Sequence, residues 1–123
     1  MVKAQRGFTV VEVLIALAIS TIGLAAMLSI HSTGSNATLY NRHATEATVL
    51  AEQAIEELLT VPTNALVNGG DVVNAQGVED PDGAYARAWT VTWTGNLAAL
   101  SVAVTWLEDD GDHTISVGTR RAR

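Results

Sequence analysis

The pattern of apolar and polar residues divides the chain into a long helical part and a shorter part with strand periodicity. Residues 8–30 contain no Lys, Arg, Asp or Pro, and this run is long enough for a membrane-spanning helix. Between Tyr40 and Leu58, apolar residues recur every three or four positions, which predicts an amphipathic helix that ends at about Val61, before a proline. Residues 32–36 (Ser-Thr-Gly-Ser-Asn) are the place where a bend would interrupt it.

Apolar and polar residues alternate with period two in the last third of the chain, at 89–93, 100–106 and 114–117. Turn-forming residues separate these runs, so they predict a three-stranded antiparallel sheet within residues 86–123. Residues 62–85 hold both prolines and several glycines, which favours an irregular connection. The apolar face of the sheet carries Trp89, Trp93 and Trp106, and we expect all three to be core residues packed on the helix.

These elements predict an α+β fold. A long N-terminal helix crosses a membrane with its first half and packs with its second half on a small antiparallel sheet. The length of 123 residues allows one modest domain, and the absence of cysteine excludes disulfides and thiolate metal sites. The net charge of −6 argues against nucleic acid as a partner, because Arg120, Arg121 and Arg123 are best explained as a solvated tail.

Basic residues precede the apolar run and predict its orientation. Lys3 and Arg6 favour a cytoplasmic N-terminus, with the chain after about Ile30 on the far side of the membrane. The run is longer than the apolar core of an ordinary secretory signal, and it lacks a small-residue cleavage site behind it.

Glu12 is a carboxylate inside this apolar run. An unpaired charge in hydrocarbon costs several kcal/mol, so such residues tend to be paired and functional. If the chain is cut between Gly7 and Phe8, the new amine of Phe8 lies four residues before Glu12. The two groups would then neutralise each other, within one subunit or between neighbours. The alternative is a glutamate that is merely tolerated near the lipid headgroups.

Residues 6–14, Arg-Gly-Phe-Thr-Val-Val-Glu-Val-Leu, closely resemble the processing site of type IV prepilins and of the pseudopilins of type II secretion. The resemblance implies that a prepilin peptidase cuts after Gly7, that Phe8 is then N-methylated, and that Glu12 pairs with a neighbour's N-terminus during filament assembly. It also implies the pilin architecture. Residues 41–59 and the strand that begins at Trp89 resemble V-type minor pilins in particular.

The resemblance implies a minor pilin that is built into a type IV pilus and acts in assembly, priming or a tip complex, and so in adhesion and motility. Its partners would be the major pilin, other minor pilins, the prepilin peptidase, the inner-membrane assembly machinery and membrane lipid. We expect a single span in a bacterial inner membrane with a periplasmic head, and later a place in a filament at the cell surface. The alternatives are an I-type minor pseudopilin of type II secretion and a membrane-anchored binding module whose tryptophans line a site.

The corresponding division of the chain has five parts. They are a leader peptide (1–7), an assembly helix (8–30), an amphipathic second half of the helix (31–61), an αβ-loop (62–85) and the sheet (86–123).

The sequence contains no recognisable catalytic motif, so we expect neither an enzyme nor a cofactor. His31, His43 and His113 lie far apart in the sequence, which argues against a shared metal. The acidic clusters 79–82 and 108–112 offer oxygen ligands of the kind that Ca²⁺ prefers, but neither follows the EF-hand spacing. Solvated turns are the favoured interpretation, and no metal site is expected.

Overall fold

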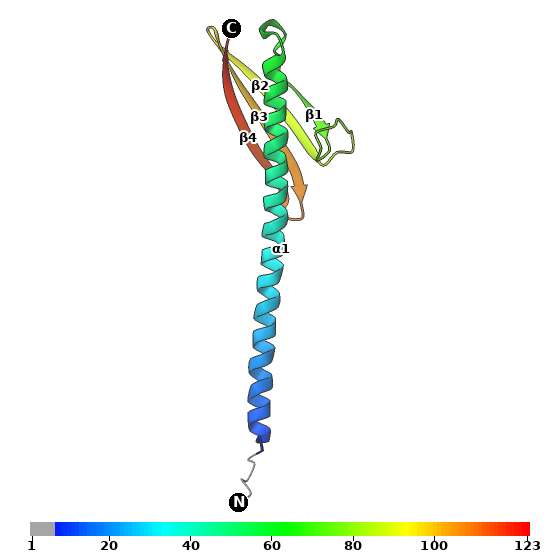
Figure 1. Ribbon diagram of the computed structural model, residues 1–123, viewed down its shortest axis with the longest axis vertical. Coiled ribbons are helices and arrows are strands. Elements are labelled where there is room, and N and C mark those ends of the chain that lie inside the picture. Colours follow the sequence, from blue (N-terminus) through cyan, green and yellow to red (C-terminus); the bar gives the residue numbers. More distant parts are fainter. Residues whose placement is uncertain (1–6) are drawn as a thin grey trace, which may run out of the picture. The chain divides into compact units, whose positions relative to one another are not determined.

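A computed structural model of the protein describes residues 7–123, which form one long helix, a short 3-10 helix and four strands (Figure 1). The elements are α1 (Val10–Thr60), η1 (Thr63–Ala65), β1 (Gly69–Val73), β2 (Tyr85–Thr94), β3 (Leu97–Glu108) and β4 (Gly111–Ala122). These residues divide into two compact units, one that ends at Leu39 and one that comprises Tyr40–Arg123. Most of the predicted leader, including Lys3 and Arg6, lies outside the described residues.

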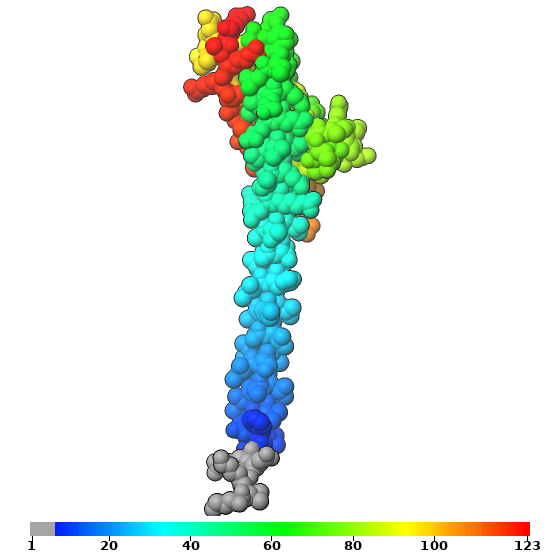
Figure 2. Space-filling model, viewed as in Figure 1, coloured from blue at the N-terminus to red at the C-terminus, as the bar shows by residue number. Residues whose placement is uncertain are grey.

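The first unit contains the N-terminal part of α1, and all its described side chains are exposed. Figure 2 shows these side chains projecting from the blue and cyan part of the helix. Within residues 7–123, α1 is the one helix whose length and composition would allow it to cross a membrane. An uncovered apolar surface of this size is unusual for a soluble monomer and requires lipid or other subunits around it.

The helix continues through residues 32–36, so the bend that the sequence left open is not formed. The hydroxyls of Thr33 and Thr38 donate hydrogen bonds to the carbonyls of Ser29 and Gly34, at 3.1 and 2.9 Å. These side chains are therefore satisfied by the helix itself and do not draw its backbone into a turn.

The second unit contains the C-terminal half of α1, which lies against one face of the sheet (Figure 1). Its buried residues follow helical spacing and are Ala47, Leu50, Ala51, Ala54, Ile55 and Leu58. This confirms the predicted packing of the amphipathic segment on the sheet. The helix ends at Thr60 because Pro62 cannot continue it.

The sheet is antiparallel, with the order β1-β2-β3-β4. The predicted turns are confirmed, because Gly95 and Asn96 join β2 to β3, and Asp109 and Asp110 join β3 to β4. The prediction of three strands was wrong. A fourth, β1, lies inside the segment 62–85 that was expected to be irregular.

The composition of β1 hid it from pattern analysis, because two of its five residues are glycines. Both glycines are needed for close approach to β2. A Cβ atom on Gly69 would lie 2.8 Å from the ring of Trp89, and one on Gly70 would lie 2.7 Å from the carbonyl oxygen of Arg87. A short edge strand with glycines at such contacts carries little of the usual apolar alternation.

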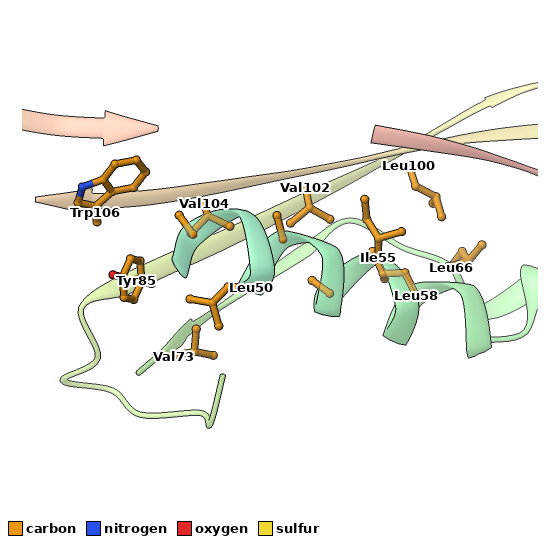
Figure 3. Close-up of a cluster of buried hydrophobic side chains, with 13 residues drawn as sticks. Leu50, Ile55, Leu58, Leu66, Val73, Tyr85, Leu100, Val102, Val104 and Trp106 are labelled. Carbon is orange, nitrogen blue, oxygen red and sulfur yellow. The ribbon is translucent and has the colours of Figure 1, made fainter. Parts of the chain in front are cut away.

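The core lies between α1 and the central strand β3. Figure 3 shows side chains of the helix facing side chains of the sheet; those labelled are Leu50, Ile55, Leu58, Leu66, Val73, Tyr85, Leu100, Val102, Val104 and Trp106. Alternate residues of β3, from Ala98 to Trp106, are buried, as its period-two pattern predicts.

The three tryptophans do not share one environment. Trp106 is only 3% exposed and Trp89 is half-buried, but Trp93 is 39% exposed. The prediction that Trp93 is a core residue was therefore wrong. Trp93 lies at the end of β2 and lines an open pocket together with Asn64 of η1 and Arg123.

A charged pair joins β1 to β2 beneath the helix. The side chain of Arg87 is only 4% exposed and donates two hydrogen bonds to the carboxylate of Asp71, one of them from Nε at 2.7 Å. The guanidinium also approaches the carbonyl of Leu50 on α1, at 3.5 Å. The hydrogen bond to Asp71 raises the pKa of Arg87 above its ordinary value.

Candidate functional site

The predicted cleavage site lies just before α1. Gly7, Phe8 and Thr9 are outside the helix, and the side chain of Phe8 is 89% exposed. The Gly7–Phe8 peptide bond is therefore in an accessible, non-helical segment, which is the form in which a protease can take up a substrate strand.

Glu12 closes the first turn of α1 by a reciprocal pair of hydrogen bonds with Thr9. The backbone N–H of Thr9 donates to Glu12 Oε2 at 2.8 Å, and the backbone N–H of Glu12 donates to Thr9 Oγ1 at 3.2 Å. The Thr9 hydroxyl also donates to the same carboxylate oxygen, at 3.0 Å. This arrangement is a capping box, with Thr9 at the N-cap and Glu12 at the third helical position.

The capping box gives the Glu12 carboxylate a hydrogen-bonding partner within its own chain. Sequence analysis overlooked it, although the signature Thr-x-x-Glu is present at residues 9–12. The capping box also bears on the prediction that the amine of Phe8 pairs with Glu12 of the same subunit. A helical spacing between Phe8 and Glu12 requires Phe8 to be helical, but α1 begins at Val10. Within one described chain, the carboxylate binds Thr9.

The surface that follows Glu12 is apolar and uncovered. Large side chains along the first turns of the helix are half or more exposed; among them are Val10, Leu14, Leu17, Ile22, Met27 and Ile30. The one hydroxyl in the middle of this surface with a recorded bond is that of Thr21, which donates to the carbonyl of Ala18 at 2.8 Å. The segment therefore presents an apolar helix in which the Thr21 hydroxyl is satisfied by the helix backbone.

A second group of functional side chains gathers where α1 meets the β3–β4 turn. His43 Nδ1 lies 3.0 Å from Glu108 Oε1, and the indole N–H of Trp106 donates to the same oxygen at 2.8 Å. His113 Nε2 lies 2.8 Å from Asp110 Oδ1 and 3.9 Å from Glu108 Oε2. The sequence argued against a metal shared by the histidines, and the structure adds that His43 and His113 both contact Glu108.

These contacts shift the ionisation of the group. The hydrogen bond from Trp106, followed by that from His43, lowers the pKa of Glu108 below its ordinary value of 4.5. The hydrogen bond to Asp110 raises the pKa of His113 above its ordinary value of 6.5. His31 is exposed on α1 in the other compact unit.

The remaining candidates are explained by local structure. In the segment 79–82, the Asp80 carboxylate accepts the backbone N–H of Asp82 at 3.0 Å, so this acidic cluster forms a turn as predicted. The tryptophans do not line one common site, since Trp106 is buried while Trp93 is exposed beneath the guanidinium of Arg123, at 5.8 Å.

Comparison with known proteins gives one result. Residues 2–28 match the family model of the prokaryotic N-terminal methylation motif. No curated protein and no solved structure matches the chain significantly. The matched residues include the predicted cleavage site, the capping box and most of the apolar surface described above. The chain therefore carries a type IV pilin-like, prepilin-type N-terminal methylation motif, joined to a pilin-like α+β fold.

Proposed function

We propose that this protein is a minor pilin, a filament subunit that acts in the assembly or tip complex of a type IV pilus. The motif implies processing by a prepilin peptidase and assembly with other pilins, and the apolar helix implies anchoring in a membrane. The observation that carries the proposal is the position of Glu12. Its carboxylate is fixed in the first turn of an uncovered apolar helix, five residues after an exposed Gly7.

The proposed assembly mechanism uses the charge of Glu12. Cleavage after Gly7 creates an amine on Phe8, which is then methylated. In a low-dielectric environment, this amine and the Glu12 carboxylate of a neighbouring subunit attract each other strongly, and each is costly to leave unpaired. The pairing would set the axial position of one helix against the next, while the apolar surfaces provide the packing.

The proposed location follows from the charges before the helix. Lys3 and Arg6 favour a cytoplasmic N-terminus, which would put the head Tyr40–Arg123 in the periplasm until the subunit enters the filament. The head would then remain on the filament surface.

The first test is the intact mass of the protein purified from its native cells, with sequencing of its N-terminal fragment. A mature chain that begins with N-methylated Phe8 is expected. A chain that still begins with Met1, in cells with active prepilin peptidase, would overturn the proposal.

The second test separates the pilus from type II secretion, because an I-type pseudopilin would share the leader and the helix. Deletion of the gene is expected to reduce piliation and twitching motility and to leave the secretion of folded exoproteins unchanged. The opposite phenotype would assign the protein to the secretion system.

A further inference from the structure

The group at the β3–β4 turn has the donor set of a metal site. Glu108, Asp110 and His113 each direct one ligand atom into a common space, with all three atoms within 4.8 Å of one another. Two ligands of a tetrahedral ion at about 2.1 Å are separated by about 3.4 Å. The recorded separations from His113 Nε2, 2.8 Å to Asp110 and 3.9 Å to Glu108, lie on either side of that value.

The two oxygens of Glu108 have different surroundings. Oε1 accepts hydrogen bonds from the indole of Trp106 and the imidazole of His43, at 2.8 and 3.0 Å. Oε2 has no such donor and faces His113. Hydrogen bonds to the non-ligating oxygen orient a carboxylate and fix which oxygen is free for a metal. His43, which comes from α1, therefore contributes an outer contact to a group built on β3 and β4.

The imidazole of His113 is also held by packing. Its ring stacks on Trp106 at 5.7 Å with an interplanar angle of 26°, and it meets Tyr40 edge-on at 5.1 Å. Trp106 and His113 are direct cross-strand partners in the β3–β4 ladder. The nitrogen that faces the carboxylates is thus positioned by two aromatic contacts and by the register of the hairpin.

We propose that Glu108, Asp110 and His113 bind a divalent transition-metal ion, with Zn²⁺ as the preferred ion and His43 as the outer residue that orients Glu108. One imidazole and two carboxylates suit Zn²⁺, whereas Ca²⁺ prefers ligand sets made of oxygen alone. Binding displaces the Nε2 proton of His113, which now bonds to Asp110, and the ion takes its place between them. Three protein ligands leave a fourth position for water or for a donor from a neighbouring subunit.

A bound ion would connect the hairpin tip to the helix through His43 and would stabilise the folded head by mass action. The proposal is independent of the pilus assignment, because it uses only residues of the head.

The test is calorimetric titration of the full-length, metal-stripped protein in detergent with Zn²⁺. We expect saturable 1:1 binding and a rise in melting temperature. Asp110→Asn and His113→Gln should each abolish both effects, and His43→Gln should weaken binding about 10- to 100-fold. Asp110→Asn is the decisive variant, since its side chain is 73% exposed and the substitution leaves the core intact. His31→Gln is the matched control and should bind as the parent does.

Absorption of the Co²⁺ complex gives a second readout. Four-coordinate Co²⁺ has strong visible bands, which should appear in the parent and vanish in Asp110→Asn. The proposal is overturned if the parent binds Zn²⁺ no better than Asp110→Asn and His113→Gln do. Equal binding of Ca²⁺ and Zn²⁺ would overturn the assignment to a transition metal.

Discussion

The backbone N–H of Thr9 donates a 2.8 Å hydrogen bond to the carboxylate of Glu12, and the backbone N–H of Glu12 donates a hydrogen bond to the Thr9 hydroxyl. A charge that looks isolated in the sequence is thereby built into the first turn of α1. Two hydrogen-bond donors of the helix N-terminus and one carboxylate oxygen are satisfied together.

Thr9→Val removes the hydroxyl of this capping box. Loss of an N-cap typically costs about 1 kcal/mol, so the amides of the first helical turn should exchange about fivefold faster in detergent. Hydrogen exchange followed by mass spectrometry or NMR measures this effect. Thr21→Val is the control, because the Thr21 hydroxyl bonds to the carbonyl of Ala18 in the middle of the helix. Equal exchange in the Thr9 variant and the parent would show that the cap contributes nothing.

Glu12→Gln should separate processing from assembly. The Gly7–Phe8 bond lies outside the helix, so cleavage and methylation should proceed normally. Incorporation should fail, because the amide carries no charge to pair with a neighbour's amine. Mass analysis of the membrane fraction and immunoblots of sheared filaments provide the two measurements. Glu56→Gln, an exposed position on the same helix, should assemble normally. Filaments that contain the Glu12 variant at parental levels would argue strongly against the pairing role.

Arg87→Ala should destabilise the head by about 3 kcal/mol, because it leaves Asp71 without its partner beneath the helix. Urea unfolding of the full chain in detergent, followed by tryptophan fluorescence, measures the change. The matched variant Arg120→Ala alters an exposed arginine of β4 and should change stability by less than about 0.5 kcal/mol. Similar midpoints for the two variants would contradict a stabilising role for the Arg87–Asp71 pair.

The two most different tryptophans should respond differently to truncation. Trp106→Ala removes a ring that is 3% exposed and should cost about 3–5 kcal/mol, whereas Trp93→Ala should cost about 0.5–1 kcal/mol. Thermal melts of both variants under identical conditions test the order. A reversed order of the two melting temperatures would contradict the assignment of Trp106 to the core and of Trp93 to the surface.

The hydrogen bond between Tyr85 and Glu46 leads to a prediction of how the free energy of unfolding depends on pH. The Tyr85 hydroxyl donates to the Glu46 carboxylate, and this bond, with a smaller contribution from Arg42, lowers the pKa of Glu46 below 4.5. Burial, followed by the bond to Glu46, raises the pKa of Tyr85 above 10.0. A lowered carboxyl pKa stabilises the fold above pH 4.5, and this contribution is lost as the pH falls. A raised tyrosine pKa stabilises the fold below pH 10, and this contribution is lost as the pH rises.

A comparison of the parent with Tyr85→Phe isolates the contribution of the Tyr85–Glu46 hydrogen bond to stability. The difference in free energy of unfolding between parent and variant should be widest near neutral pH and should narrow below pH 4.5 and above pH 10. Urea titrations across this range measure the difference. A difference that is constant with pH would show that the variant loses packing alone.

Much of the fold could be predicted from the sequence, because long periodic segments dominate it. The apolar stripe from Ala44 to Leu58 and the alternation along β3 each identify a buried face without knowledge of the rest. Strand β1 could not be found in this way. Its identity depends on Gly69 and Gly70 fitting against β2, and that contact exists only in the assembled sheet.

The N-terminal methylation motif was equally visible, since its residues are neighbours in the chain. The group of side chains at the β3–β4 turn was not, because it joins His43 to Glu108, which is 65 positions away in the chain. Part of it was nonetheless within reach. The residues 109–112 predict a turn; once the turn is placed at 109–110, as in the structure, Trp106 pairs with His113, and period two puts Glu108 on the same face as Trp106. Only the contact between His43 and Glu108 depends on the packing of the helix on the sheet.

Maturation of the subunit leaves the capping box intact, because the Thr9 amide belongs to the peptide bond after Phe8, one bond beyond the cut. Under the proposed mechanism, a processed subunit therefore waits in the membrane with its carboxylate already satisfied. Joining a filament becomes an exchange of partners for Glu12, from the amide and hydroxyl of Thr9 to the amine of a neighbouring subunit. The same exchange run backwards returns a released subunit to its resting state, so the chemistry of this turn is suited to filaments that are both built and dismantled.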